Sequence, residues 1–183
     1  MKVTGIVRKL DDLGRVVIPK EIRRTMRIRE GDPLEIYTSR EGEVIFKKYS
    51  PIGELSEFAS QYAETLYKTC NLSVLITDRD AVIAAAGVSK REYLEKNLSE
   101  GLENIIEGRS LYIYREGSEK CAPILEGGSH YVRCAMPIIS EGDVVGCVVS
   151  LCDMSEKGSA PNQEIESKLI MTAAGFLGRQ LEI

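Results

Sequence analysis

The chain has 183 residues, of which 43% are hydrophobic and 28% charged, and its formal net charge is −4. This composition is typical of a folded chain and not of a disordered one. No run approaches the roughly 20 apolar residues of a membrane helix, and no signal-peptide core is visible. We therefore expect a cytoplasmic protein without a membrane partner. The five cysteines are an odd number without C-x-x-C spacing, so we expect reduced thiols.

The first fifty residues predict four short strands around one helix. The strand-like runs are Val3 to Lys9, Gly14 to Ile18, Leu34 to Thr38 and Glu43 to Lys48. Ile18-Pro19 marks the change from strand to helix, because proline keeps the preceding residue extended while its own φ suits a first helical turn. A ββαββ fold of this size has too small a core to be stable alone, so we expect an obligate dimer.

Basic residues concentrate in this N-terminal part. Residues 1–50 carry 12 Lys and Arg against 8 Asp and Glu, a net +4, whereas residues 51–183 carry 12 against 20, a net −8. In the expected helix Ile22 and Met26 are four apart and share one face. The basic residues of that helix are Lys20, Arg23, Arg24 and Arg27. Such a cluster attracts phosphate whatever the overall charge, although a solvated basic face would give the same tally.

A short joint at residues 49–53 leads to a second part of the chain, so we place the domains at residues 1–53 and 54–183. The expected elements are a helix from Leu55 to Leu66, a hairpin of Leu72 to Thr77 and Ala81 to Ala86, mainly helical chain over 89–107, a longer hairpin from Tyr131 to Cys152 and a helix from about Pro161. Gly146, inside the last strand, predicts a bulge or a close backbone approach. The fold class is therefore α+β, an antiparallel sheet with flanking helices.

The run GIVRKLDDLGRVVIPKEIRR, followed by GDPLEIYTSREGEVIFKKY, resembles the DNA-binding domain of the AbrB family of bacterial transition-state regulators. The resemblance covers residues 1–50 and includes the D-x-x-G-R-V-x-I-P segment. It implies a swapped-hairpin β-barrel in which two chains interlock, consistent with the expected homodimer. By the family pattern, the residues that face double-stranded DNA are Arg8, Lys9, Arg15, Arg23 and Arg24. Arginine can form a fork on phosphate or on guanine, whereas lysine supplies a point charge.

The second domain resembles a GAF domain, mainly through PIISEGDVVGCVVSL and the helices on either side. Chain length and the two domains together are similar to the AbrB-like regulators of late sporulation genes in endospore-forming bacteria. The resemblance implies a DNA-binding transcriptional regulator, both activator and repressor, that forms a homotetramer through its C-terminal helices. A small-molecule ligand at the GAF-like domain and a purely scaffolding domain stay open as alternatives, and the ligand is not identified.

Three other interpretations compete with a regulator. Cys121, His130 and Cys134 are candidates for a metal or redox site, but their spacing fits no strong pattern, so we expect no metal, no cofactor and no enzyme. Some GAF proteins are cysteine-dependent reductases, which makes Cys121 and Cys134 the enzymatic alternative. A DNA-binding antitoxin is the third, although residues 54–183 have more regular apolar pattern than a disordered antitoxin tail. Lys47 and Lys48 are explained by protection of an edge strand.

Overall fold

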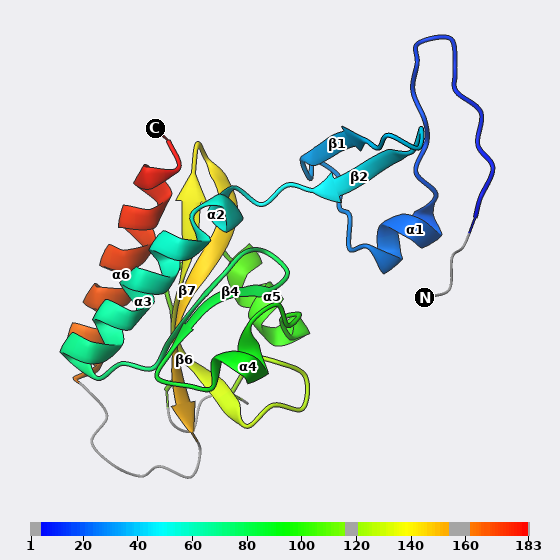
Figure 1. The fold of residues 1–183 in the computed structure, drawn as a ribbon. Helices are drawn as coiled ribbons and strands as arrows, with labels where there is room; N and C mark the ends of the chain where they lie inside the picture. The colour runs from blue at the N-terminus through cyan, green and yellow to red at the C-terminus, as the bar shows by residue number, and fades with distance from the viewer. Residues whose placement is uncertain (1–4, 116–120, 154–161, 183) are drawn as a thin grey trace. The chain divides into compact units, whose positions relative to one another are not determined.

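The computed structural model describes residues 5–115, 121–153 and 162–182, and the chain divides into two compact units, one up to Tyr49 and one from Ser50 onward (Figure 1). Each unit has its own secondary structure and is considered by itself. No helix within these described ranges is both long and apolar enough to cross a bilayer.

The helix of the N-terminal unit begins where the sequence predicts. Pro19 is extended, with φ −57° and ψ 148°, and its carbonyl accepts the first helical hydrogen bond from the backbone N–H of Arg23 at 2.9 Å. Helix α1 runs over Lys20–Thr25. The prediction that Met26 and Arg27 belong to the helix is wrong, because Arg27 adopts a left-handed φ of 51° that ends it.

Strands β1, Leu34–Thr38, and β2, Val44–Lys48, form the predicted antiparallel hairpin. Their register pairs Leu34 with Lys48 and Thr38 with Val44. The turn between them is closed by Ser39, whose hydroxyl oxygen accepts hydrogen bonds from the backbone N–H groups of Glu41 and Glu43, both at 3.2 Å.

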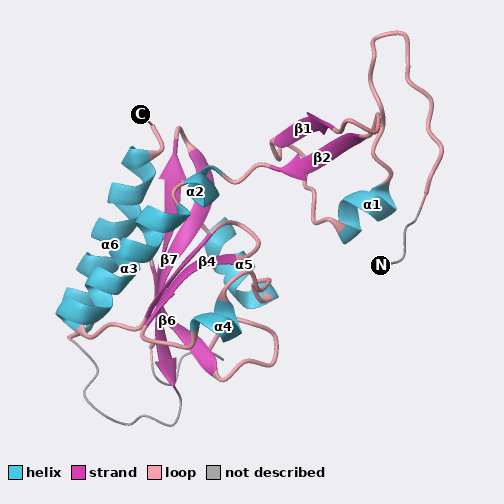
Figure 2. Ribbon diagram, in the orientation of Figure 1, coloured by secondary structure: helices cyan, strands magenta, loops and turns pink. Residues whose placement is uncertain are grey.

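The two strands expected before α1 are not formed in the single chain. Residues 5–18 are extended around a turn but make no ladder, and Figure 2 draws them as loop; residues 3 and 4 of the first predicted strand lie outside the described ranges. The reason is that a strand needs a hydrogen-bonded partner along its length. Within residues 5–18 the backbone hydrogen bonds are those of the turn: the N–H of Asp11 donates to the carbonyl of Arg15, and the N–H of Gly14 donates to the carbonyl of Asp11, both at 3.1 Å.

The C-terminal unit is built on a five-stranded sheet in the order β4-β3-β7-β6-β5, with every pair antiparallel. The strands are β3 Val74–Thr77, β4 Val82–Ala86, β5 Tyr112–Ile113, β6 His130–Ser140 and β7 Asp143–Asp153. Both predicted hairpins are confirmed, and β7 of the longer one, β6 with β7, is the central strand of the sheet.

Helices cover both faces of this sheet. The helices are α2 Pro51–Glu54, α3 Ser56–Cys70, α4 Lys90–Tyr93, α5 Glu100–Glu107 and α6 Gln163–Gln180. Helices α3 and α6 lie side by side on one face (Figure 1), and the ring of Phe176 packs 5.8 Å from Phe58 and 5.7 Å from Tyr62 between centroids. The opposite face is covered by α4, α5 and the chain around Ile124, which form a second apolar cluster.

The predicted helical stretch over 89–107 is broken in the middle. After α4 the chain turns at Glu95, which has a left-handed φ of 62°, and runs along the edge of β4. The backbone N–H of Glu95 donates to the carbonyl of Val82 at 2.9 Å, and the N–H of Val82 donates to the carbonyl of Lys96 at 3.1 Å. The edge strand is therefore protected by its own chain, which helical periodicity did not indicate.

A buried polar network holds the start of α6 against the sheet. Glu166 is 1% exposed, and its carboxylate accepts hydrogen bonds from Nε of Arg133 at 2.8 Å and from the hydroxyl of Ser150. The Ser150 oxygen also accepts the backbone N–H of Cys134 at 3.1 Å. Since a buried carboxylate is costly unless it is paired, this network fixes where α6 begins. Pro161, the predicted start, lies outside the described residues.

Two glycines set the closest approaches in this unit. A Cβ at Gly146 would overlap the backbone carbonyl of Thr77 on β3, and a Cβ at Gly178 would overlap the carbonyl of Ile139 on β6. The β6–β7 register also shifts beside Gly146. The prediction of a bulge or a close backbone approach at Gly146 is thus confirmed on both counts.

Replacing Gly146 by alanine should destabilise the C-terminal unit by about 1–3 kcal/mol, because β3 must move to admit the methyl group. Urea unfolding followed by circular dichroism measures the change. Gly175→Ala is the matched control: no atom lies within 4 Å of a Cβ there, so alanine in this helix should stabilise by about 0.5–1 kcal/mol. Equal effects of the two substitutions would contradict the assignment of the contact.

Candidate nucleic-acid interface

Residues 11–15 form the turn between the two extended segments before α1, and we call this turn the hairpin tip. Asp11 organises it. One carboxylate oxygen, Oδ1, accepts the backbone N–H of Leu13 at 3.1 Å and that of Arg15 at 2.7 Å. The other, Oδ2, accepts Nε of Arg15 at 2.7 Å. Gly14, with a φ of 76°, supplies the left-handed residue that the turn requires. The turn therefore holds the Arg15 side chain in place before any partner arrives.

The electrostatics of the tip follow from the same contacts. The backbone hydrogen bond from Arg15, and next its side-chain hydrogen bond, lower the pKa of Asp11 below its usual value of 3.8. The Arg15 side chain is 70% exposed. Among the residues that the structure describes, only its Nε is engaged, so the two terminal nitrogens can still form a fork on a phosphate or a guanine. The pair with Asp11 therefore coexists with an exposed guanidinium.

All five residues singled out in the sequence are exposed in the N-terminal unit. Arg8 and Lys9 precede the turn, and Arg15 follows it. Arg23 and Arg24 are consecutive on α1, so their side chains leave the helix about 100° apart. The helix offers six residues, too few to lie along a groove, so cations at its surface and at the hairpin tip are the groups available for contact.

Three other cations have a structural role that the sequence did not reveal. Asp32, whose side chain is only 3% exposed, pairs with Nζ of Lys48 at 3.2 Å and accepts the backbone N–H of Arg29 at 2.8 Å. The Lys48 ammonium also donates to the carbonyl of Arg27 at 2.9 Å. Edge protection is therefore the wrong explanation for Lys48, which ties the end of α1 to β2. Arg27 and Arg29 are half-buried beside this pair.

The cysteine and histidine candidates of the C-terminal unit are not gathered into a site. The ring Nδ1 of His130 is hydrogen-bonded to the Tyr93 hydroxyl at 2.7 Å. Cys134 is buried, and burial first and the negative charge of Glu166 next raise its pKa to about 12. Within the described ranges, no group of three or more His, Cys, Asp or Glu residues is placed to hold a metal ion.

Comparison with known proteins identifies both halves. A family model described as "Stage V sporulation protein T C-terminal, transcription factor" matches residues 54–182, and one described as "Antidote-toxin recognition MazE, bacterial antitoxin" matches residues 7–53. The chain is 52% identical over 184 residues to stage V sporulation protein T of Bacillus subtilis (strain 168), covering 100% of this chain and 99% of that protein.

Two further relatives match one half each. Transition state regulatory protein AbrB of Bacillus subtilis (strain 168) is 65% identical over 51 residues, which cover 28% of this chain and 52% of AbrB. The crystal structure of the nlh2 GAF domain of A. aeolicus in an inactive state is 16% identical with a TM-score of 0.50, covering 73% of this chain and 85% of that one. At that identity the likeness concerns the fold alone.

The fold and the exposed basic hairpin and helix, with these matches, define a transcription factor that joins an AbrB-like DNA-binding domain to a GAF-like domain. The resemblance to AbrB-like regulators drawn from the sequence is thus confirmed. The chain belongs to the stage V sporulation protein T family.

The pKa of Asp11 provides a test of the hairpin tip. Arg15→Ala should raise that pKa but leave it below the ordinary value, because the backbone N–H of residue 15 still donates. As the pKa of Asp11 is lowered in the folded state, its contribution to stability is present above the ordinary value and is lost as the pH falls through the lowered one. A carboxyl carbon NMR titration measures the shift. Arg24→Ala is the control and should leave it unchanged; no change with Arg15→Ala would contradict the pair.

Proposed function

We propose that this chain regulates transcription of sporulation genes, activating some promoters and repressing others, with residues 1–53 binding double-stranded DNA and residues 54–183 controlling assembly and response. Identity over the whole length to stage V sporulation protein T supports the biological role. The observation that carries the mechanism is the hairpin tip, in which Asp11 binds the backbone N–H and Nε of Arg15 while the arginine side chain stays 70% exposed. Bacterial DNA lies in the cytoplasm, so we place the protein there.

The proposed DNA contacts are Arg8, Lys9, Arg15, Arg23 and Arg24. They are exposed cations on two adjacent segments of one compact unit, separated in sequence only by the buried Pro19 and its neighbours. Phosphate contacts would supply most of the affinity and make it depend on salt, whereas an arginine fork on guanine would add sequence preference. Because α1 is short, DNA shape and bendability contribute to the choice of target.

A homodimer through the N-terminal domain follows from the missing core. Pro19 is the one buried residue between residues 5 and 49. The large apolar side chains left exposed there include Val7 at 96%, Val17 at 73% and Leu13 at 70%. A second chain would cover these side chains and also supply ladder partners for residues 5–18. Interlocking of two hairpins satisfies both needs, and it would place two copies of each arginine on one symmetric assembly.

A tetramer through the C-terminal helices is proposed on similar grounds. On α6 the side chains of Ile165, Met171 and Phe176 are 56%, 45% and 41% exposed, although the helix already packs its other side on the sheet. Phe176 adjoins Phe58 and Tyr62 of α3, so the exposed apolar surface continues across two helices. Joining two dimers here would multiply phosphate contacts and steepen the salt dependence.

Two alternative functions, a cysteine-dependent reductase and an antitoxin, have less support than a regulator. A reductase needs a thiolate, and a thiol with a pKa of about 12, as in Cys134, is almost wholly protonated at neutral pH. Burial raises the pKa of Cys147 as well. We therefore propose a regulator without catalytic activity. An antitoxin is disfavoured because the bacterial antitoxin model covers only residues 7–53, whereas the rest matches a transcription-factor family.

Single substitutions at the proposed contacts test the interface. Arg15→Ala and Arg23→Ala should each weaken binding of the full chain to promoter DNA by about 1–3 kcal/mol and lower the slope of log affinity against log salt by about 1. Fluorescence anisotropy over a salt series measures both quantities.

The matched control for these variants is Arg40→Ala. Arg40 is an exposed arginine in the same unit, in the β1–β2 turn and outside the proposed set. Its loss should leave affinity and salt slope close to wild type. If Arg40→Ala weakens binding as much as Arg15→Ala does, net charge and not a defined surface governs binding, and the interface is misassigned.

Native mass spectrometry tests the assembly. The full chain should appear as a tetramer, and Phe176→Asp, which puts a charge on the exposed helix face, should shift it to a dimer while the N-terminal domain stays paired. Glu107→Lys on α5 changes charge at an exposed position on the opposite face of the sheet, away from the proposed contact, and is the control. Dimers alone in the wild-type spectrum would rule out the tetramer.

A further inference from the structure

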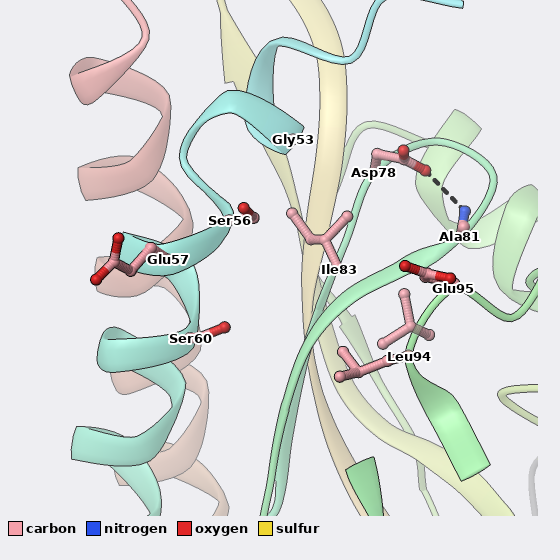
Figure 3. Close-up of a pocket in the computed structure, with 10 residues that line it drawn as sticks. Gly53, Ser56, Glu57, Ser60, Asp78, Ala81, Ile83, Leu94 and Glu95 are labelled. Carbon is pink, nitrogen blue, oxygen red and sulfur yellow. Dashed lines mark hydrogen bonds between the residues drawn. The ribbon is translucent and has the colours of Figure 1, made fainter. Parts of the chain in front are cut away.

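A groove of about 520 Å³ lies in the C-terminal unit, between the first turns of α3 and the edge of the sheet at β4 (Figure 3). One side comes from α3, the other from the β3–β4 turn, from β4 and from the chain that follows α4. The volume is in the range of small-molecule sites, roughly 300–1,000 Å³.

The base of the groove is apolar with hydroxyl groups beside it. Ile83 and Leu94 contribute aliphatic side chains, and Ser56 and Ser60 line the α3 side. In Figure 3 the branched side chain of Ile83 lies between Ser56 and Asp78, and the Ser60 hydroxyl points from α3 toward β4. This lining suits a slender aliphatic body with a few hydrogen-bonding groups.

Two carboxylates stand on the β4 side. Asp78 uses one oxygen, Oδ1, to accept the backbone N–H groups of Asp80 and Ala81, both at 2.7 Å, which leaves Oδ2 available. The Glu95 carboxylate makes no hydrogen bond or ion pair with any part of the chain that the structure describes, and in Figure 3 it lies on the same side of the groove as Asp78. The third acidic residue, Glu57, directs its carboxylate away.

The charges of the lining select the ligand class. Among the residues that the structure describes, the lining includes no lysine, arginine or histidine that would neutralise a phosphate or a carboxylate. An anionic ligand would meet two negative groups at short range, whereas a positive group would gain two charge-assisted hydrogen bonds. Nucleotides and acidic metabolites are therefore disfavoured.

We propose that this groove binds a small organic cation, an aliphatic amine whose ammonium group lies between Asp78 and Glu95 and whose carbon chain lies on Ile83. The inference deepens the sensing role within the proposed function and rests on it for its biological meaning. It names both the site and the chemical class of the ligand. The groove includes Gly53, whose backbone N–H donates to the hydroxyl oxygen of Ser50 at 3.2 Å. A bound ligand would therefore touch the segment that begins the C-terminal unit.

Calorimetric titration of the full chain with hexylamine, 1,6-diaminohexane and 1-hexanol tests the site at constant ionic strength. The two amines should bind saturably, and the alcohol, which has the same carbon chain without the charge, should bind at least tenfold more weakly. Equal binding of amine and alcohol, or no binding of either amine, overturns the proposal.

Three variants locate the binding. Glu95→Gln and Asp78→Asn should each weaken amine binding by roughly three- to tenfold, a modest factor because these carboxylates are partly solvated; asparagine keeps the oxygen that holds the turn. Ser60→Leu fills the groove without changing charge and should abolish binding. Glu107→Gln removes an equal charge from α5, outside the groove, and should have no effect. If Glu107→Gln weakens binding as much as Glu95→Gln, the site is misplaced.

Promoter DNA binding distinguishes failure of the site from failure of the function. If the amines bind as expected and also change the DNA affinity of the wild type but not of Ser60→Leu, the groove is a sensing site. If the amines bind but leave DNA affinity unchanged, the binding site is supported and the sensing role is contradicted. Loss of the site leaves the arginine interface untouched, because its variants are measured without ligand.

Discussion

Thirteen large apolar side chains between residues 5 and 49 are more than a third exposed, and Pro19 is the one buried residue in that span. An apolar surface of this size in water is unfavourable, because each exposed apolar side chain lacks the favourable free energy that burial would give it. The chemistry of the N-terminal domain depends on this constraint. In the proposed dimer a second chain covers these apolar side chains, so folding, pairing and DNA binding by the proposed arginines would be one coupled process.

The sequence predicted the parts whose hydrogen bonds are local to the chain. The break at Ile18-Pro19, the β1–β2 hairpin and the hairpin around residues 140–143 all depend on turn residues and periodicity within a few positions. The strands before α1 could not be confirmed by one chain, because their partners are not in it. The helical stretch over 89–107 failed at Glu95, where a left-handed residue without glycine interrupts a regular pattern.

For the candidate site, residue type could be predicted and local geometry could not. The family pattern named Arg15, but only the structure shows that Asp11 binds both its backbone and its side chain. Lys48 looked like an edge residue because its partner, Asp32, is sixteen positions away and buried. The groove between α3 and β4 could not be predicted either, because Ser60, Asp78 and Glu95 come from three separate segments of the chain and no regular spacing relates them.

Gly178 places the backbone of α6 directly on the carbonyl of Ile139, while Glu166 fixes the first turn of the same helix from inside the core. Twelve positions separate these two anchors, and each accepts a single kind of residue. Substitution on the outer face of α6, where the proposed contact between dimers lies, leaves both anchors in place, but insertion or deletion of even one residue between them would rotate a bulky side chain against β6. The helix is constrained in length more strictly than in composition, so homologous chains should preserve that spacing even where their outward residues diverge.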